Sequence, residues 1–293
     1  MIGVALNIIK LLVVLIVVAG AVVAVTYLSA PSTAAPANLG AASSAAVLAL
    51  KNTHLYQTLS TNKVVTLSSL VPAQNASQNY NLSYSGTVTY AAVVSGVSVP
   101  ITFPIALTNQ RFGNDSRIVL ALSKIPLISN LNLSLVKLGS KLYTCAPTNI
   151  FSKNLTYACS QSTSASPNAL GLFYLAGTGL NLTINNFYPT LQGTTPCIYM
   201  NSTFGIAGTN ARNSLGSLSS VGGAVNTGSI SSINGTLQSC LQSPSNLPLT
   251  LNIAVAVRQT NSTTNIKVAL IQVTNNTAVS DSAIRALPGN VVN

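Results

Sequence analysis

The stretch VSVPITFPIAL at 97–107 carries an apolar side chain at every odd position, and Ser, Thr, Ala or Pro at every even position. The stretch LPLTLNIAVAV at 247–257 repeats the apolar alternation, and 82–90 shows it with its apolar residues at even positions. Because successive side chains of a strand point to opposite faces, these stretches predict antiparallel strands with one apolar and one polar face. Pro100 and Pro104 cannot donate ladder hydrogen bonds, so the strand at 97–107 is expected at an edge or beside a bulge.

Shorter stretches extend the predicted sheet. Further strands are expected at 117–123, 131–138, 141–145, 154–159, 180–185, 196–204 and 265–273, with hairpin turns at 139–140 and 261–265. Asn38 can cap a helix that runs to about Leu59, whereas 205–235 is rich in Gly, Ser, Asn and Ala and is expected to be a flexible insertion. The predicted fold class is therefore α+β, predominantly antiparallel β, with a curved sheet or half-barrel and one or two helices.

The chain begins with an apolar segment, and LLVVLIVVAGAVVAVTYL at 11–28 holds no charged residue. As a helix this segment measures about 27 Å, close to the hydrocarbon thickness of a bilayer. Lys10 precedes it, so the positive-inside rule places the N-terminus in the cytoplasm. We expect a single-pass transmembrane anchor over 1–29, a linker over 30–37 and one extracytoplasmic domain over 38–293. A signal peptide cleaved after Ala30 is the alternative.

Charged residues make up only 5% of the sequence, with 13 Lys and Arg against two acidic residues and a net charge of +11. The basic residues are spread thinly along the chain, whereas a nucleic-acid-binding protein clusters them to neutralise phosphates. Nucleic acid is therefore not an expected partner. Ser, Thr, Asn and Gln supply the surface polarity, which suits a glycosylated surface protein or one exposed to low external pH, where carboxylates are neutral.

The sequence contains four cysteines, all beyond the apolar segment. Four cysteines outside a membrane are expected to form two disulfides, for which three pairings exist. We expect neighbours in the sequence to pair, as Cys145–Cys159 and Cys197–Cys240. With no Cys-x-x-Cys motif and a single His, the sequence predicts neither a metal site nor a cofactor.

Asn-x-Ser/Thr sequons also follow the apolar segment, at a frequency only slightly above that expected from composition. These glycosylation candidates are Asn75, Asn81, Asn114, Asn132, Asn154, Asn181, Asn201, Asn234, Asn261 and Asn275. Their positions agree with an extracytoplasmic domain.

Acid–base catalysis requires positioned titratable groups, and this chain has few. Asp115 and Asp281 occur in the contexts NDSR and SDSA, neither of which resembles the loop of an aspartic protease. His54 is the single histidine, and no Gly-x-Ser-x-Gly motif presents a nucleophile. The sequence therefore predicts no catalytic residue and a protein that is not an enzyme.

The order of the predicted elements is informative as a whole. A helix precedes long alternating hairpins, followed by GSKLYTC at 139–145, a second cysteine in NLTYACS at 154–160, and LPLTLNI at 247–253 after Cys240. This order, over about 60–275, resembles the LolA/LppX-type lipoprotein-carrier fold, in which a curved antiparallel half-barrel cups a lipid chain. The lipobox cysteine of the lipoprotein members is missing, and the Gly/Ser-rich 205–235 replaces their helical lid.

The resemblance implies a hydrophobic-ligand face, which would be formed by Val99, Ile101, Phe103, Ile105, Leu251, Ile253 and Val255. The alternative is that these residues form a closed core. Three functions follow: a non-catalytic surface or envelope protein with the membrane and envelope proteins as partners, a tethered carrier of a lipid or other hydrophobic ligand, and a surface filament subunit.

Overall fold

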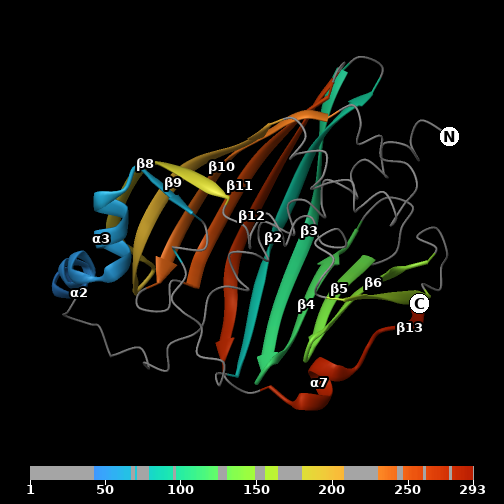
Figure 1. Ribbon diagram of the computed structural model, residues 1–293. Helices are drawn as coiled ribbons and strands as arrows, with labels where there is room; N and C mark the ends of the chain where they lie inside the picture. Colours follow the sequence, from blue (N-terminus) through green and yellow to red (C-terminus); the bar gives the residue numbers. More distant parts are fainter. Residues whose placement is uncertain are drawn as a thin grey trace.

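The computed structural model describes residues 43–66, 70, 79–94, 97–124, 131–148, 156–163, 180–207, 230–242, 247–259, 262–276 and 279–292. These residues form one 13-stranded sheet with short helices at its margins (Figure 1). The predicted class, mainly antiparallel sheet with few helices, is confirmed. The anchor expected over 1–29 and the linker over 30–37 lie outside the described residues. No helix in the described part of the chain has the length and apolar character needed to cross a membrane.

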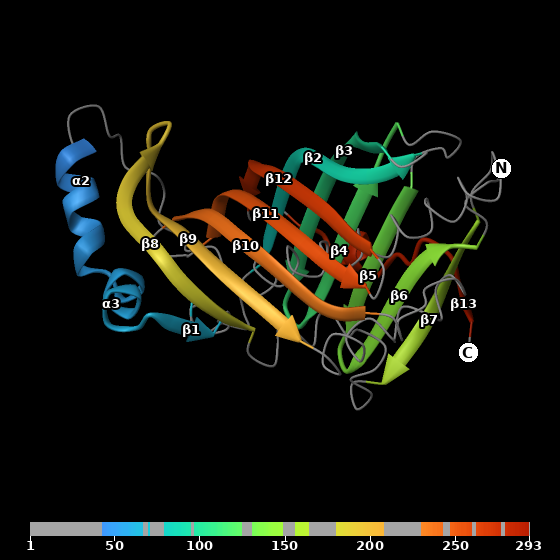
Figure 2. The ribbon, with the colours of Figure 1, turned by 90° about the horizontal axis from the view of Figure 1, so that it is seen from above.

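The sheet consists of two meanders joined edge to edge. Its order is β1-β8-β9-β10-β11-β12-β2-β3-β4-β5-β6-β7-β13, and the meanders meet where β12 pairs with β2. All neighbouring strands are antiparallel except β7 and β13. The bounds are β1 (Val64–Thr66), β2 (Tyr80–Val94), β3 (Val97–Phe112), β4 (Asp115–Leu122), β5 (Leu131–Leu138), β6 (Lys141–Pro147), β7 (Tyr157–Thr163), β8 (Asn181–Gln192), β9 (Thr195–Ala207), β10 (Ile230–Gln242), β11 (Leu247–Gln259), β12 (Ser262–Asn276) and β13 (Asn290–Val292). Seen from above, the sheet bends into an open arc (Figure 2).

Each predicted strand is present, and several are longer than the alternation indicated. The strand expected at 154–159 is displaced toward the C-terminus as β7. The insertion expected over 205–235 is wrong at both ends, because β9 continues to Ala207 and β10 begins at Ile230, whereas 208–229 lie outside the described residues. The turn expected at 261–265 is shorter, since β12 already begins at Ser262.

The proline-containing half of β3 lies at a local edge of the sheet, as predicted. β2 pairs with β3 along its whole length, but β4 pairs only with the part from Ile105 to Phe112. Pro100 and Pro104 therefore lie where no second ladder needs their missing N–H groups.

Alternate side chains of the strands from β8 to β5 form one hydrophobic core on a single face, which we call the inner face; the opposite face is the outer face. Two glycines allow neighbouring groups to come close to the backbone of the sheet. A Cβ atom at Gly86 would collide with the carbonyl of Ala269 in β12, and one at Gly235 would collide with the Phe204 ring. Glycine at such positions allows a sheet to bend tightly.

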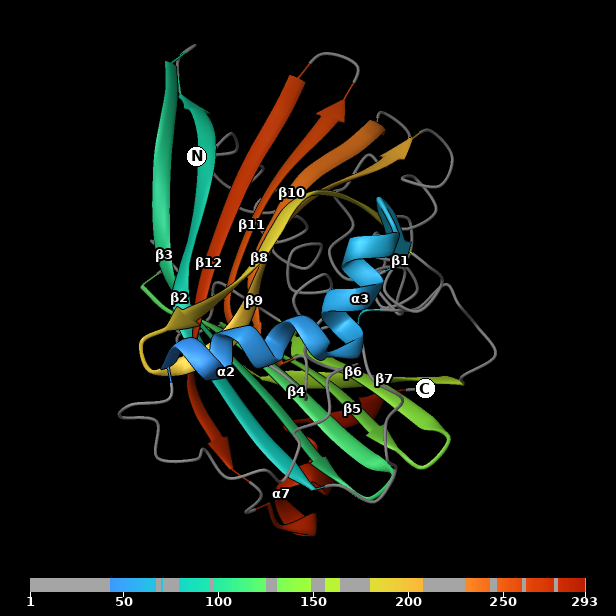
Figure 3. The same ribbon diagram turned by 90° about the vertical axis from the view of Figure 1, so that its left-hand side faces the viewer.

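Three short helical segments replace the single helix expected from Asn38 to Leu59. They are α2 (Ser43–Ala49), the 3-10 helix η1 (Leu50–Asn52) and α3 (His54–Thr61), and they lie at the β8–β9 end of the sheet (Figure 3). Thr53 interrupts the helix and caps α3, because its hydroxyl accepts a hydrogen bond from the Tyr56 N–H at 3.3 Å. The helical spacing of Leu48, Leu55 and Leu59 suggests a face that packs on the sheet; Leu55 and Leu59 join the core, whereas Leu48 is 59% exposed.

Candidate functional site: the two faces of the sheet

The strands at 97–107 and 247–257 lie on either side of the β12–β2 junction. The register places Ile253, Val268, Val88 and Phe103 in one row across β11, β12, β2 and β3. Of the residues expected to face a ligand, Phe103, Ile105, Leu251, Ile253 and Val255 are at most 4% exposed, and Ile101 packs against the same cluster. The Val99 side chain lies outside the described residues. The structure therefore brings six of the seven together in a buried core, and a ligand-binding role for them stays a prediction.

Polar side chains interrupt this apolar inner face toward the start of β2. Tyr84 is paired with Gln272 of β12, and Asn109 of β3 is paired with Leu82. Burial raises the pKa of Tyr84, nearby Tyr80 raises it further, and the Gln272 side chain opposes the shift. The phenol is therefore held in its neutral form.

The outer face of β4–β7 is covered by the C-terminal segment. Val136, Tyr143 and the Cys145–Cys159 disulfide form a second buried cluster there, against which Leu287 packs. The helix α7 (Asp281–Arg285) lies over β3, β4 and β5, and its Ile284 is fully buried. This covering gives the outer face of β4–β7 a structural role.

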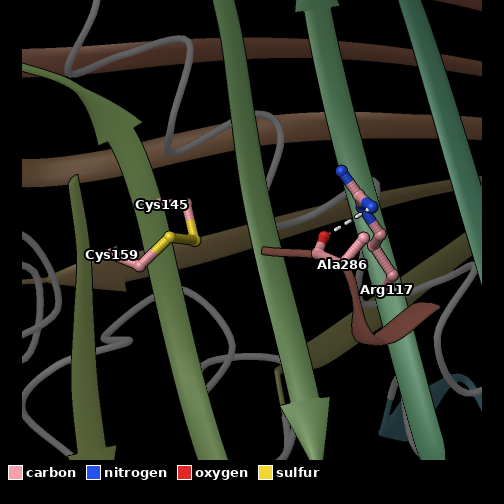
Figure 4. The surroundings of a disulfide bond; sticks show 4 residues. All are labelled: Arg117, Cys145, Cys159 and Ala286. Carbon is pink, nitrogen blue, oxygen red and sulfur yellow. Dashed lines mark hydrogen bonds between the residues drawn. A yellow bond between two sulfur atoms is a disulfide. The ribbon is translucent and has the colours of Figure 1, made fainter. Parts of the chain in front are cut away.

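Arg117 of β4 ties the C-terminal segment to the sheet. Its guanidinium donates hydrogen bonds to the carbonyls of Ala283 and Ala286, each at 2.9 Å. Figure 4 shows the bond to Ala286 beside the Cys145–Cys159 disulfide. Partial burial lowers the pKa of Arg117, but a guanidinium remains charged at physiological pH.

Both acidic side chains of the protein are bound to one arginine. Arg285 contacts the Asp115 carboxylate at 2.9 Å and the Asp281 carboxylate at 2.9 Å. Asp115 also accepts a hydrogen bond from the Gly139 N–H at 2.7 Å, so it joins the β5–β6 turn to α7. Its side chain is only 10% exposed. The structure thus uses these carboxylates to attach the C-terminal helix.

The predicted disulfide pairing is confirmed. Cys145 and Cys159 are direct cross-strand partners in β6 and β7, and Cys197 bonds Cys240 between β9 and β10. The register assigns both disulfides to the outer face, where each joins neighbouring strands. Disulfides persist in oxidising compartments, so the chain belongs outside the cytoplasm.

The outer face of β8–β12 differs from that of β4–β7, because side chains remain exposed on it. Ile271 is 59% exposed and Tyr188 is 48% exposed. The Tyr188 ring stacks on the Tyr199 ring, with centroids 4.9 Å apart and planes at 29°. Small or neutral polar side chains occupy most other outward positions, including those of Thr236, Asn252 and Ala269. Exposed apolar and aromatic side chains therefore lie on this face beside the buried Cys197–Cys240 disulfide.

The described sequons lie mostly at exposed positions. Asn114, Asn132, Asn181 and Asn234 are exposed, whereas Asn81 and Asn201 are half-buried. Asn75, Asn154 and Asn261 lie outside the described residues, as does the side chain of Asn275. Their glycosylation stays a prediction.

The titratable residues considered for catalysis do not converge. His54 is exposed on α3 and lies 3.4 Å from the Thr58 hydroxyl, while both aspartates are engaged with Arg285 on the outer face of the other meander. Within the described ranges, no three His, Cys, Asp or Glu residues gather in a way that could hold a metal ion.

Two features of the outer face were missed by sequence reasoning, namely the tyrosine stack and the Arg285 network. Both join residues that are brought together by strand register or by chain segments up to 170 residues apart. The only local signal was the i,i+4 spacing of Asp281 and Arg285 in α7.

The structure therefore defines an extracytoplasmic, disulfide-linked, open and curved antiparallel sheet. No protein-family model and no curated protein matches the sequence. Among solved structures, LprF from Mycobacterium bovis is 10% identical, with a TM-score of 0.31 and coverage of 80% of this chain and 97% of that chain. A DUF1329 family protein from Desulfovibrio piger is 8% identical, with a TM-score of 0.28 and coverage of 75% of this chain and 92% of that chain. Rv2717c from M. tuberculosis is 8% identical, with a TM-score of 0.26 and coverage of 68% of this chain and 94% of that chain. Likenesses this loose carry no argument about the ligand.

Proposed function

We propose that the protein is a non-catalytic, membrane-anchored surface or envelope protein that binds its partner through the outer face of β8–β12. The observation that carries this proposal is the contrast between the two faces. The inner face is used as a packed core, with Leu251, Ile253 and Val255 at most 3% exposed. The outer face of β8–β12 instead keeps Tyr188 and Ile271 in contact with solvent.

The location outside the cytoplasm is supported by the two disulfides and the neutral polar surface. The anchor itself rests on the apolar segment at 11–28 and on Lys10. Exposed Asn114, Asn132, Asn181 and Asn234 are the described sequons best placed to carry glycans.

The absence of catalysis is supported by the positions of the titratable groups. General acid–base chemistry needs a group within hydrogen-bond reach of a bound substrate. Asp115 in β4 and Asp281 in α7 instead both bind Arg285 of α7. His54 lies at the opposite end of the sheet, near the Thr58 hydroxyl.

A tethered carrier of a lipid is the second candidate, and one observation favours it. The apolar inner face is continuous from β8 to β5, while the described helices α2 and α3 lie at its β8–β9 end. A carrier would open this core to admit a hydrocarbon chain against Phe103 and Ile253. A filament subunit would depend on residues 1–28, outside the described residues.

Native mass spectrometry of the full chain released from detergent, followed by organic extraction, tests the proposal. A surface protein gives the mass of the chain with its glycans and an extract free of lipid. A stoichiometric lipid in both measurements would replace the proposal by the carrier. Ordered polymers after detergent removal, lost when residues 1–28 are deleted, would replace it by the filament subunit.

A further inference from the structure

The outer face of β8–β11 carries two parallel rows of side chains. The first row begins with the stacked pair Tyr188 and Tyr199 and continues through Cys240 to Thr250, since these residues are successive cross-strand partners. The Cys197–Cys240 disulfide fixes β9 to β10 at this row. The aromatic pair is thus held on a covalently braced part of the sheet.

The second row consists of amides. Asn186, Asn201, Gln238 and Asn252 are successive partners across β8, β9, β10 and β11. Neighbouring strands lie about 4.8 Å apart, so the four amides extend over about 14 Å. Asn201 follows Tyr199 by two residues on the same strand, which sets the two rows about 7 Å apart. We call the two tyrosines and the four amides together the tyrosine–amide platform.

The platform is uncharged. On strands β8–β11 neither row contains an ionisable group other than the two phenols, and the neighbouring row holds Thr183, Thr203, Thr236 and Ala254. The first basic side chain met in that row is Lys267, one strand further on in β12. An anionic partner would find no counter-charge at the platform, although the whole chain has a net charge of +11.

Amides and aromatic rings together match the chemistry of a sugar. Each amide offers both a donor and an acceptor, which suits the paired hydroxyl groups of a pyranose ring. The apolar C–H face of the same ring packs on an aromatic face, and tyrosine offers this rigid contact at low entropic cost. A row of amides at strand spacing can meet successive units of a polymer.

We propose that the tyrosine–amide platform binds an uncharged polysaccharide, with its sugar rings against Tyr188 and its hydroxyl groups on the amide row. The inference rests on the proposed role of the outer face as a binding surface and adds the chemical class of the ligand. Asn201 lies in the sequon Asn201-Ser202-Thr203, and its amide can contact a ligand only where it carries no glycan.

Affinity electrophoresis of the full chain in neutral detergent tests this inference. The protein is produced in a host that adds no N-glycans, and the probes are uncharged hydroxyethyl cellulose and mannan, with anionic alginate as the comparison. At least one neutral polymer retards the protein, and about 0.5 M salt leaves that retardation unchanged because no ion pair contributes. Tyr188→Ala lowers the affinity at least about tenfold and Asn252→Ala about threefold, as expected for one ring contact and one amide.

Two matched variants on the same face serve as controls. Phe112→Ala removes another exposed aromatic ring, and Asn265→Ala removes an amide outside the platform; both bind within about twofold of the parent. Circular dichroism of each variant verifies that the sheet is intact. The inference is overturned if neither neutral polymer retards the protein, if only alginate does so and salt abolishes it, or if Tyr188→Ala binds like the parent. If the chain carries no lipid and neither neutral polymer retards it, this inference alone is overturned. If native mass spectrometry finds a bound lipid, the proposed function is overturned.

Discussion

The outer faces of the two meanders are built alike and used differently. Each contains a disulfide between neighbouring strands and a tyrosine near it: Tyr143 with Cys145–Cys159 in β6–β7, and Tyr199 with Cys197–Cys240 in β9–β10. On β4–β7 the C-terminal segment covers these groups, and Tyr143 is 8% exposed. On β8–β12 the disulfide is likewise buried, with Cys197 and Cys240 at most 2% exposed, but Tyr188 beside Tyr199 is 48% exposed.

The difference shows how one sheet can have both a structural and a binding surface. Covered apolar groups contribute to stability because they leave water. Exposed aromatic and amide groups contribute little to stability, so their arrangement is open to selection for binding. Removal of equivalent groups from the two meanders tests whether their outer faces have these different roles.

Removal of the disulfides should give the largest effects. On the loop-entropy relation, the 43-residue separation of Cys197 and Cys240 corresponds to about 4 kcal/mol, and the 14-residue separation of Cys145 and Cys159 to about 3 kcal/mol. Paired Cys→Ala variants measured by urea unfolding should therefore lose stability in that order. A larger loss at Cys145–Cys159 would mean that burial under the C-terminal segment outweighs loop closure.

Truncation of one tyrosine on each meander compares the covered and uncovered faces directly. Tyr143→Ala should lower the free energy of unfolding by about 3 kcal/mol, because it empties a buried site. Tyr188→Ala should cost less than about 1 kcal/mol, since its ring is already half in solvent. Equal losses in urea unfolding would contradict the distinction between the two faces.

Detachment of the C-terminal helix should have an intermediate effect. Asp115→Ala leaves the Gly139 N–H without its acceptor and releases Arg285, for an expected loss of about 2 kcal/mol. The contact with Arg285 contributes the smaller part, because that side chain is 61% exposed and screened by solvent. Asp281→Ala is the control, with a change below about 0.5 kcal/mol. Hydrogen exchange of 281–287 should quicken in the first variant and not in the second.

The smallest effect concerns Tyr84 on the inner face. Its pKa is raised in the folded state, so the neutral phenol stabilises the fold fully below the unfolded value of 10.0, and this contribution falls as the pH rises further. Between pH 9 and pH 11 the parent should lose about 1.4 kcal/mol more than Tyr84→Phe, which cannot ionise. Urea unfolding at the two pH values measures the difference. Parallel losses in both proteins would show that Tyr84 is not buried as neutral phenol.

Local alternation and cysteine spacing predicted most of the sheet and both disulfides. The strand β10 was missed because its inner positions read Ile233, Gly235, Leu237, Ser239 and Leu241, so glycine and serine hide the period of two. The edge strands β1 and β13 are three residues long, too short for a periodic signal. The platform could not be predicted, because its residues come from four strands and meet only through the register.

Hydroxyl-radical footprinting of the full chain in its own membrane tests whether the outer face of β8–β12 is exposed and the inner face is buried, since it compares side chains on both faces at once. We expect rapid modification of Tyr188 and protection of Tyr143, Tyr84 and Phe103. Added uncharged polysaccharide should then protect Tyr188 while leaving exposed Phe112 reactive. Rapid modification of Phe103 and Tyr84 together with a protected Tyr188 would contradict it, and would identify the inner face as the open, ligand-binding surface.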